Sequence, residues 1–234
     1  DINKGRANSI KILGRLLWRM HKETDDRVLL HDISGGNKDN AIPREAKATV
    51  YVNDGLGEAE KTMLKISEEI RREYREIEPD MKINIGEQRK ENEIELIDPD
   101  STKKAIYLIE ALPHGVLSMS QKVQGLVKTS TNLATVDRKD REMEVVMKSR
   151  SSSKHELETT RNQIQAIAEI CGADVEENQP YPGWEPNTDS ELLTVFKKTF
   201  KDTFNEEAKT QAIHAGLETG IIGEKFEEIG RAHV

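Results

Sequence analysis

Apolar residues in the first half of the chain recur at two spacings. Over residues 3–22 they return every three or four positions, as on one face of an amphipathic helix: Ile10, Leu13, Leu17 and Met20. Over residues 44–52 they alternate with polar residues, which is typical of a strand with one buried face. A β-prone run precedes this strand at residues 28–34, helical spacing returns over 57–76, and alternation returns over 81–85. The order predicted here is helix, strand, strand, helix, strand.

The second half repeats this order behind one additional strand, at residues 94–97. A helix begins at the start signal Asp98-Pro99-Asp100-Ser101 and ends at Pro113. Strands follow at 126–136 and 142–148, then a helix that opens at the capping box Ser153-x-x-Glu156, and a last strand at 173–177. The predicted fold class is α+β, with two tandem split βαβ (ferredoxin-like) units, the first lacking its opening strand, and an antiparallel sheet covered by helices on one face.

The composition changes at residues 180–186, where three prolines in seven residues predict a domain crossing. An amphipathic helix from Ser190, a strand at 210–213 and a strand-to-helix turn at 214–220 follow, as in an incomplete piece of an α/β domain. The predicted divisions are residues 1–183, residues 184–227 and a non-native tail over 228–234. The chain is thus interpreted as a fragment.

Charge and composition narrow the classes of function. The formal net charge is −8, and no basic patch with interleaved aromatic residues is present, which argues against nucleic acid as the main ligand. No apolar run approaches the roughly 20 residues that span a bilayer, so no membrane partner is expected. The single Cys171 cannot form an internal disulfide. The cytoplasm is the simplest compartment for such a chain.

One connection between predicted strands carries candidate chemistry. Two glycines and two asparagines lie within residues 34–43, so this turn can adopt positive φ. Pro43 suits the first position of a strand, and Asn40 is thereby held at the strand's mouth with an amide donor and a carbonyl acceptor. The alternative is a plain hairpin in which Asn40 has no functional role.

Six motifs along the chain resemble one family. They are D-I-N-K-G-R-A-N, G-G-N-x-x-N-A-I-P-R-E-A, L-P-H-G-V, K-S-R-S-S, Y-P-G-W-x-P-N and I-H-A-G-L-E-T-G, in this order. Together they resemble the aminoacyl-histidine (Xaa-His) dipeptidases, metallopeptidases related to carnosinases and zinc aminoacylases. The resemblance extends over residues 1–226. It implies a cytoplasmic hydrolase with a catalytic domain that binds two zinc ions, and an inserted lid domain that closes on a dipeptide substrate and forms a homodimer.

The resemblance also implies roles for individual residues. Asn40 matches a lid asparagine that binds substrate, Arg150 a lid arginine that grips the substrate carboxylate, and Gly216 a glycine that lets backbone approach the ligand. His214 lies beside Gly216 and is expected on the substrate side; it could instead be structural. His233 mimics a metal-binding histidine but lies in the suspected tail, so it is not assigned to a metal.

The family's metal ligands and catalytic residues match no position of this sequence. The two zinc ions are therefore expected in the full-length parent and none in this chain, which alone should be inactive. From the residues themselves, Arg150 could equally be a surface arginine at the end of a strand. A rival hypothesis is a non-enzymatic binding or dimerisation module built on split βαβ units. The segment after Trp184 favours the enzyme, because a free-standing module would have no use for it.

Overall fold

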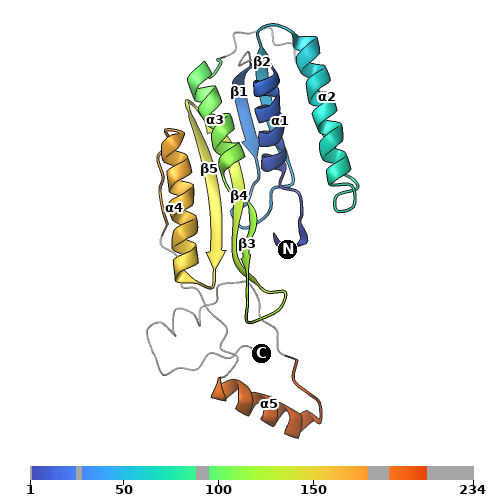
Figure 1. Ribbon diagram of the computed structural model, residues 1–234, viewed down its shortest axis with the longest axis vertical. Coiled ribbons are helices and arrows are strands. Elements are labelled where there is room, and N and C mark those ends of the chain that lie inside the picture. The colour runs from blue at the N-terminus through green and yellow to red at the C-terminus, as the bar shows by residue number, and fades with distance from the viewer. Residues whose placement is uncertain (1, 25–27, 88–94, 179–189, 210–234) are drawn as a thin grey trace. The chain divides into compact units, whose positions relative to one another are not determined.

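A computed structural model describes residues 2–24, 28–87, 95–178 and 190–209 (Figure 1). Its elements are η1 Ile2–Lys4, α1 Ser9–Glu23, β1 Val28–Gly35, β2 Ala46–Val52, α2 Leu56–Glu73, α3 Pro99–Ala111, β3 Gly115–Met119, β4 Val127–Lys139, β5 Glu142–Ser151, α4 Lys154–Ile170 and α5 Glu191–Phe204. The chain divides into two compact units. Unit 1 comprises Asp1–Gly115, Thr131–Lys148 and Asn162–Val175; unit 2 comprises Val116–Ser130, Ser149–Arg161 and Glu176–Val234.

Five strands form one sheet in the order β2-β1-β4-β3, and β5 pairs with β4. β1 and β2 are antiparallel, with their register running from Val28 opposite Val52 to Gly35 opposite Ala46. β1 meets β4 antiparallel at Ser34 and Gly35. The predicted α+β class with an antiparallel sheet is confirmed, and the predicted order of helix, hairpin, helix occurs twice. The sequence pattern did not predict β3.

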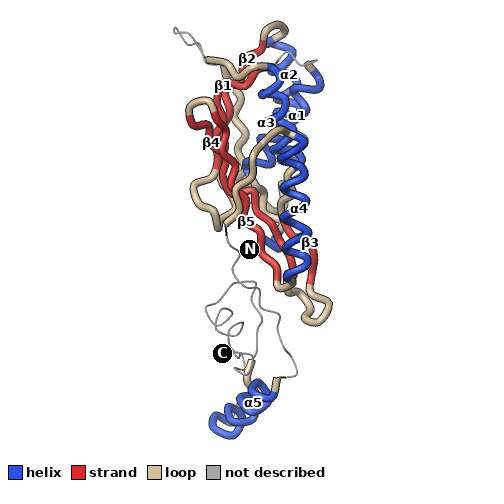
Figure 2. The backbone as a smooth tube through the Cα atoms, turned by 90° about the vertical axis from the view of Figure 1, so that its left-hand side faces the viewer, coloured by secondary structure: helices blue, strands red, loops and turns tan. Residues whose placement is uncertain are grey.

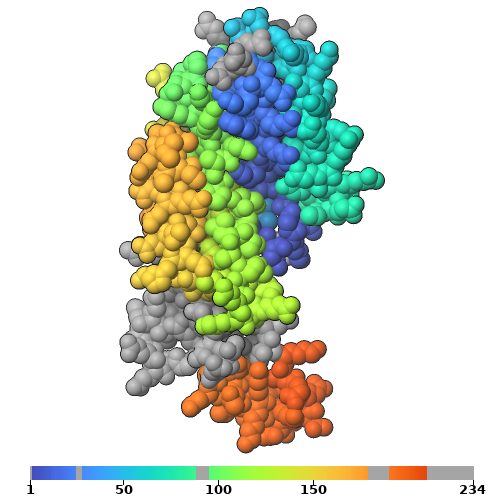
Figure 3. All heavy atoms as spheres, viewed as in Figure 1, coloured from blue at the N-terminus to red at the C-terminus, as the bar shows by residue number. Residues whose placement is uncertain are grey.

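In unit 1, helices cover one face of the sheet. α1 lies between α2 and α3, and the strands lie behind α1 and α3 (Figures 1–3). Gly14 permits the close approach of α1 to α3, because a Cβ atom there would lie 2.6 Å from Ile109 Cγ2. The ring of Trp18 packs edge-on against Tyr107 of α3, with centroids 4.7 Å apart. The core between these helices and the sheet contains Ile10, Leu17, Met20, Leu30, Ile33, Ile106, Ile109 and Leu133.

A smaller apolar cluster joins α1 to α2. Leu16 packs there with Ile66 and Ile70, and the half-buried Met81 and Ile83 cover them. The strand predicted over residues 81–85 is wrong, because this segment has no paired strand. Its alternation of apolar and polar residues arises because every second side chain packs on the two helices.

Two further predicted strands are not strands. Residues 95–97 run beside β1, where the Ile97 amide donates to the Leu30 carbonyl at 2.8 Å, but no ladder continues. Residues 173–177 also lack strand pairing. The expected left-handed cap of α4 is confirmed, since Gly172 has φ of 70° and its amide donates to the Glu169 carbonyl.

Helix starts also differ from the sequence pattern. α1 begins at Ser9, because the Asn8 side chain accepts hydrogen bonds from the amides of Ile10 and Lys11 as an N-cap. The capping box predicted for α4 is half formed: Ser153 Oγ accepts from the Glu156 amide, whereas the Glu156 carboxylate binds elsewhere. Ser151 Oγ accepts the Ser153 amide in its place.

In unit 2, α5 presents aromatic side chains at helical spacing. The rings of Phe196 and Phe200 are 6.3 Å apart between centroids, and those of Phe200 and Phe204 are 4.8 Å apart. α5 contains no buried residue. Within the described ranges, no helix is long and apolar enough to cross a membrane.

Candidate functional site

The loop between β1 and β2, residues 36–45, presents Asn40 at the surface of unit 1. The loop begins at Gly36, which has φ of 72°. The Gly36 amide donates to the Glu45 carbonyl at 3.1 Å. A Cβ atom at Gly36 would lie 2.0 Å from the Ala134 carbonyl oxygen of β4, so glycine is required for two reasons. This confirms the positive φ that the sequence of the turn permitted.

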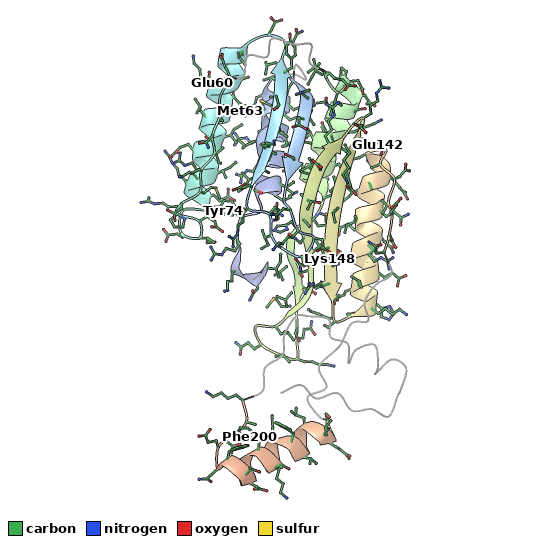
Figure 4. The ribbon with its side chains drawn as sticks, turned by 180° about the vertical axis from the view of Figure 1, so that it is seen from behind. Glu60, Met63, Tyr74, Glu142, Lys148 and Phe200 are labelled. Carbon is green, nitrogen blue, oxygen red and sulfur yellow. The ribbon has the colours of Figure 1, made fainter. Side chains whose placement is uncertain are left out.

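Three contacts hold the rest of this loop. The Asn132 side chain on β4 donates to the Ala41 carbonyl at 2.7 Å. Lys148 on β5, labelled in Figure 4, forms a 3.1 Å ion pair with Asp39. The Pro43 carbonyl accepts from the amide of Ser9 at 3.1 Å. Asn40 itself is exposed, and its side chain forms no hydrogen bond with the described residues. A fixed loop therefore presents an amide that is available to a ligand.

Hydrogen bonds connect the start of α1 to the segment that follows α3. The Asn8 Nδ2 group donates to the Leu133 carbonyl at 2.8 Å and lies 3.2 Å from His114 Nδ1. Because an amide nitrogen only donates, His114 Nδ1 accepts, and a neutral ring carries its proton on Nε2. Burial, and secondarily the charge of Lys11, lowers the pKa of His114 to about 4. His114 is therefore neutral near pH 7 and serves a structural role.

Lys11 stabilises the end of α3 in the same region. Its Nζ donates to the carbonyls of Ile109, Glu110 and Leu112 at 2.8, 2.6 and 3.0 Å. These carbonyls belong to the last turn of α3, where a cation is favoured by the helix dipole. Burial lowers the pKa of Lys11, and the charge of Glu110 partly opposes this. Three of the sequence motifs, R-A-N, L-P-H-G-V and G-G-N, are thus in contact through Asn8, Ser9, His114 and Pro43.

Arg150, near the end of β5, belongs to unit 2, whereas Asn40 belongs to unit 1. Its side chain is exposed and forms no ion pair with the described residues. The segment around it is well anchored. Ser151 Oγ lies 2.8 Å from Thr129 Oγ1, and the Ser152 amide donates to the Lys128 carbonyl at 3.0 Å. The guanidinium therefore extends from a fixed strand end.

The Glu156 carboxylate, at the start of α4, is bound by side chains of β3 and β4 in unit 2. It accepts from Ser118 at 2.5 Å and from the Thr129 hydroxyl, and it pairs with Lys128. Hydrogen bonds from Lys128, Ser118 and Thr129 lower the pKa of Glu156 to about 2. Glu156 thus joins β3, β4 and α4 close to Arg150 in the sequence. Nothing in the sequence pattern predicted this role beyond the capping box.

The remaining predicted site residues, His214 and Gly216, lie outside the described residues, as does His233. Among the residues that the structure describes, no three histidine, cysteine, aspartate or glutamate side chains gather into a group that could hold a metal. The described residues therefore do not fit a zinc site. What the described part does contain is an exposed amide and an exposed guanidinium, each on a rigid segment.

Residues 1–80 match the family model of the peptidase dimerisation domain. Over 239 residues the chain is 30% identical to the cytosol non-specific dipeptidase of Escherichia coli (strain K12), covering 98% of this chain and 47% of the relative. The chain also matches the crystal structure of aminoacylhistidine dipeptidase from Vibrio alginolyticus with a TM-score of 0.87 and 30% identity, covering 96% of this chain and 45% of that one.

The resemblance inferred from the six motifs is confirmed by these matches. The chain spans about half the length of the relatives it matches. The relatives are named as dipeptidases, which identifies the class of reaction for them. The match to a peptidase dimerisation domain favours the predicted homodimer, which stays a prediction.

Proposed function

We propose that this chain is the lid and dimerisation part of a cytoplasmic metallo-dipeptidase that hydrolyses Xaa-His dipeptides. In this proposal residues 1–183 form the lid and residues 184–227 return into the catalytic domain. The observation that carries the proposal is the pair of exposed polar groups, Asn40 and Arg150, on anchored segments of a chain similar to dipeptidases. Neither group forms a hydrogen bond or ion pair with the described residues.

The chemistry of the two groups suits the carboxylate end of a dipeptide. A guanidinium offers two parallel N–H donors to a carboxylate, and a primary amide adds one donor and one acceptor. When a lid closes, such groups orient the substrate and are shielded from water, which strengthens their interactions. The two zinc ions of the proposal would be held by residues other than those described here, and His214 and Gly216 would line the substrate side.

A non-enzymatic dimerisation module is the second candidate, because the family match covers residues 1–80. Both functions predict a homodimer, so oligomeric state does not separate them. They differ in Arg150, which has a task only when a substrate carboxylate is bound. Kinetics of an Arg150 variant therefore test the enzyme hypothesis directly.

In the proposed dipeptidase, Arg150→Lys should lower kcat/KM for β-alanyl-histidine by roughly ten- to a hundredfold, because one of two charge-assisted hydrogen bonds is lost, at about 1.5–3 kcal/mol. Since the lid closes during the reaction, part of the loss should fall on kcat. The thermal midpoint should stay unchanged because Arg150 is exposed.

Arg75→Lys changes another exposed arginine, in unit 1, and serves as the control. Its kcat/KM should remain at the parental value. If the folded Arg150→Lys variant keeps the parental kcat/KM, Arg150 does not bind substrate. That result would favour the dimerisation module.

A further inference from the structure

The two residues beside Asn40 are each held by a side chain from another strand. Before it, Asp39 pairs with Lys148 on β5; after it, the Ala41 carbonyl accepts from Asn132 on β4. The two attachments differ in strength. Lys148 and Asp39 have side chains 47% and 56% exposed, and ion pairs in such positions contribute little. Asn132 is 8% exposed, so its hydrogen bond is shielded from water.

The hydrogen bond from Asn132 is unambiguous in its direction. A backbone carbonyl only accepts, so the atom 2.7 Å from the Ala41 oxygen must be the Nδ2 donor. The other atom of the amide, Oδ1, is buried and has no partner among the described residues. The one hydrogen bond that the Asn132 side chain makes within the described part is therefore directed to the loop. It joins positions 91 residues apart in the sequence.

We propose that Asn132 is a positioning residue that fixes the loop so that the Asn40 amide is presented to the substrate; this rests on the proposed function. Holding the Ala41 carbonyl fixes the peptide plane that follows Ala41. The next residue, Ile42, is restricted by Pro43, whose own carbonyl is held by Ser9. From Ala41 to Pro43 the loop is thus fixed, and Asn40 is the residue directly before this fixed segment.

The consequence for activity follows from geometry. A displacement of about 1 Å at a substrate-binding group can reduce a rate about a hundredfold, although no contact to the reacting atoms is changed. Asn132 does not itself need to touch the substrate. Its replacement should therefore act through Asn40, and only while Asn40 is present.

The test has a structural part, on the 234-residue chain, and a kinetic part, on the proposed dipeptidase. Asn132→Leu keeps a similar side-chain volume and removes the donor; Asn132→Ala serves if leucine prevents folding. The NMR order parameters of the Asn40 and Ala41 backbone amides should fall from rigid values to about 0.6 or less, while α1 and α3 keep the parental values. Lys148→Met breaks the exposed ion pair to the same loop and should leave these order parameters close to the parental values.

In the kinetic part, Asn132→Leu should lower kcat/KM for β-alanyl-histidine roughly tenfold in the parental background and less than about twofold in the Asn40→Ala background. Equal losses in both backgrounds would overturn the inference, as would unchanged order parameters at Asn40 and Ala41. If Asn40→Ala has parental activity, the substrate role of Asn40 fails, and the inference with it. If Asn40→Ala is impaired while Asn132→Leu is not, only the inference fails.

Discussion

At the scale of single residues, several polar side chains stabilise the fold only in one protonation state. His114 is the clearest case in unit 1. Its Nδ1 accepts from Asn8, and Lys11 lies close enough to lower its pKa further. A protonated ring could no longer accept at Nδ1 and would add a second positive charge beside Lys11. The neutral form is therefore the one that the native structure requires.

This requirement predicts a pH dependence. The native pKa of His114 is about 4, below the ordinary 6.5, so the unfolded chain binds more protons between these values. The contribution to stability is complete above pH 6.5 and is lost as the pH falls towards 4. Urea titrations of the chain and of His114→Gln should show a difference in unfolding free energy that changes by at most about 1.4 kcal/mol per pH unit in this window. Parallel pH profiles would contradict the assigned role.

At the scale of elements, the β1–β2 connection shows how one backbone position determines a loop. Gly36 combines positive φ with close contact to β4. A Cβ atom at Gly57 in α2, by contrast, would point into open space. The two glycines therefore form a matched pair. One is required by its surroundings and the other only lowers helix propensity.

Gly36→Ala should lower the free energy of unfolding by about 2 kcal/mol or more, because strain in φ adds to a collision with the Ala134 carbonyl. Gly57→Ala should raise it by up to about 1 kcal/mol. Chemical denaturation of both variants at neutral pH measures the two values. Equal stabilities would show that the loop around Gly36 rearranges without cost.

The elements themselves could largely be predicted from the sequence. Helical spacing identified five helices, and alternation identified the β1–β2 and β4–β5 hairpins. The same alternation misled at residues 81–85, because a segment packed on two helices buries every second side chain just as a strand does. β3 was missed because its five residues lack a clear alternation. Whether a segment forms a strand depends on whether another strand lies beside it, and the local sequence pattern carries no information about that neighbour.

At the scale of the whole molecule, the sequence identified candidate substrate-binding side chains but not the residues that hold their segments in place. Asn40 and Arg150 follow from motifs, and the structure shows both exposed. Asn132, Lys11 and Glu156 hold their partners through contacts between segments distant in the sequence, and nothing in their local sequence distinguishes them. His214 and Gly216 stay predictions.

The metal content of the chain is a further prediction at this scale. No group of metal ligands occurs among the described residues, and the resemblance assigns the zinc ligands to no position of this sequence. We expect the 234-residue chain, after dialysis, to retain no stoichiometric zinc and not to hydrolyse β-alanyl-histidine. Elemental analysis and an activity assay measure both. Tight binding of two zinc ions per chain would disprove the expectation.

The central claim is that this chain recognises the carboxylate of a dipeptide, and one comparison tests it most directly. Kinetics of the proposed dipeptidase and of its Arg150→Lys variant are measured with β-alanyl-histidine and with the same dipeptide as its C-terminal amide. The amide lacks the negative charge that Arg150 would bind. We predict that Arg150→Lys lowers kcat/KM roughly ten- to a hundredfold for the acid and less than about threefold for the amide. An equal loss for both substrates, or no loss for either, would contradict the account.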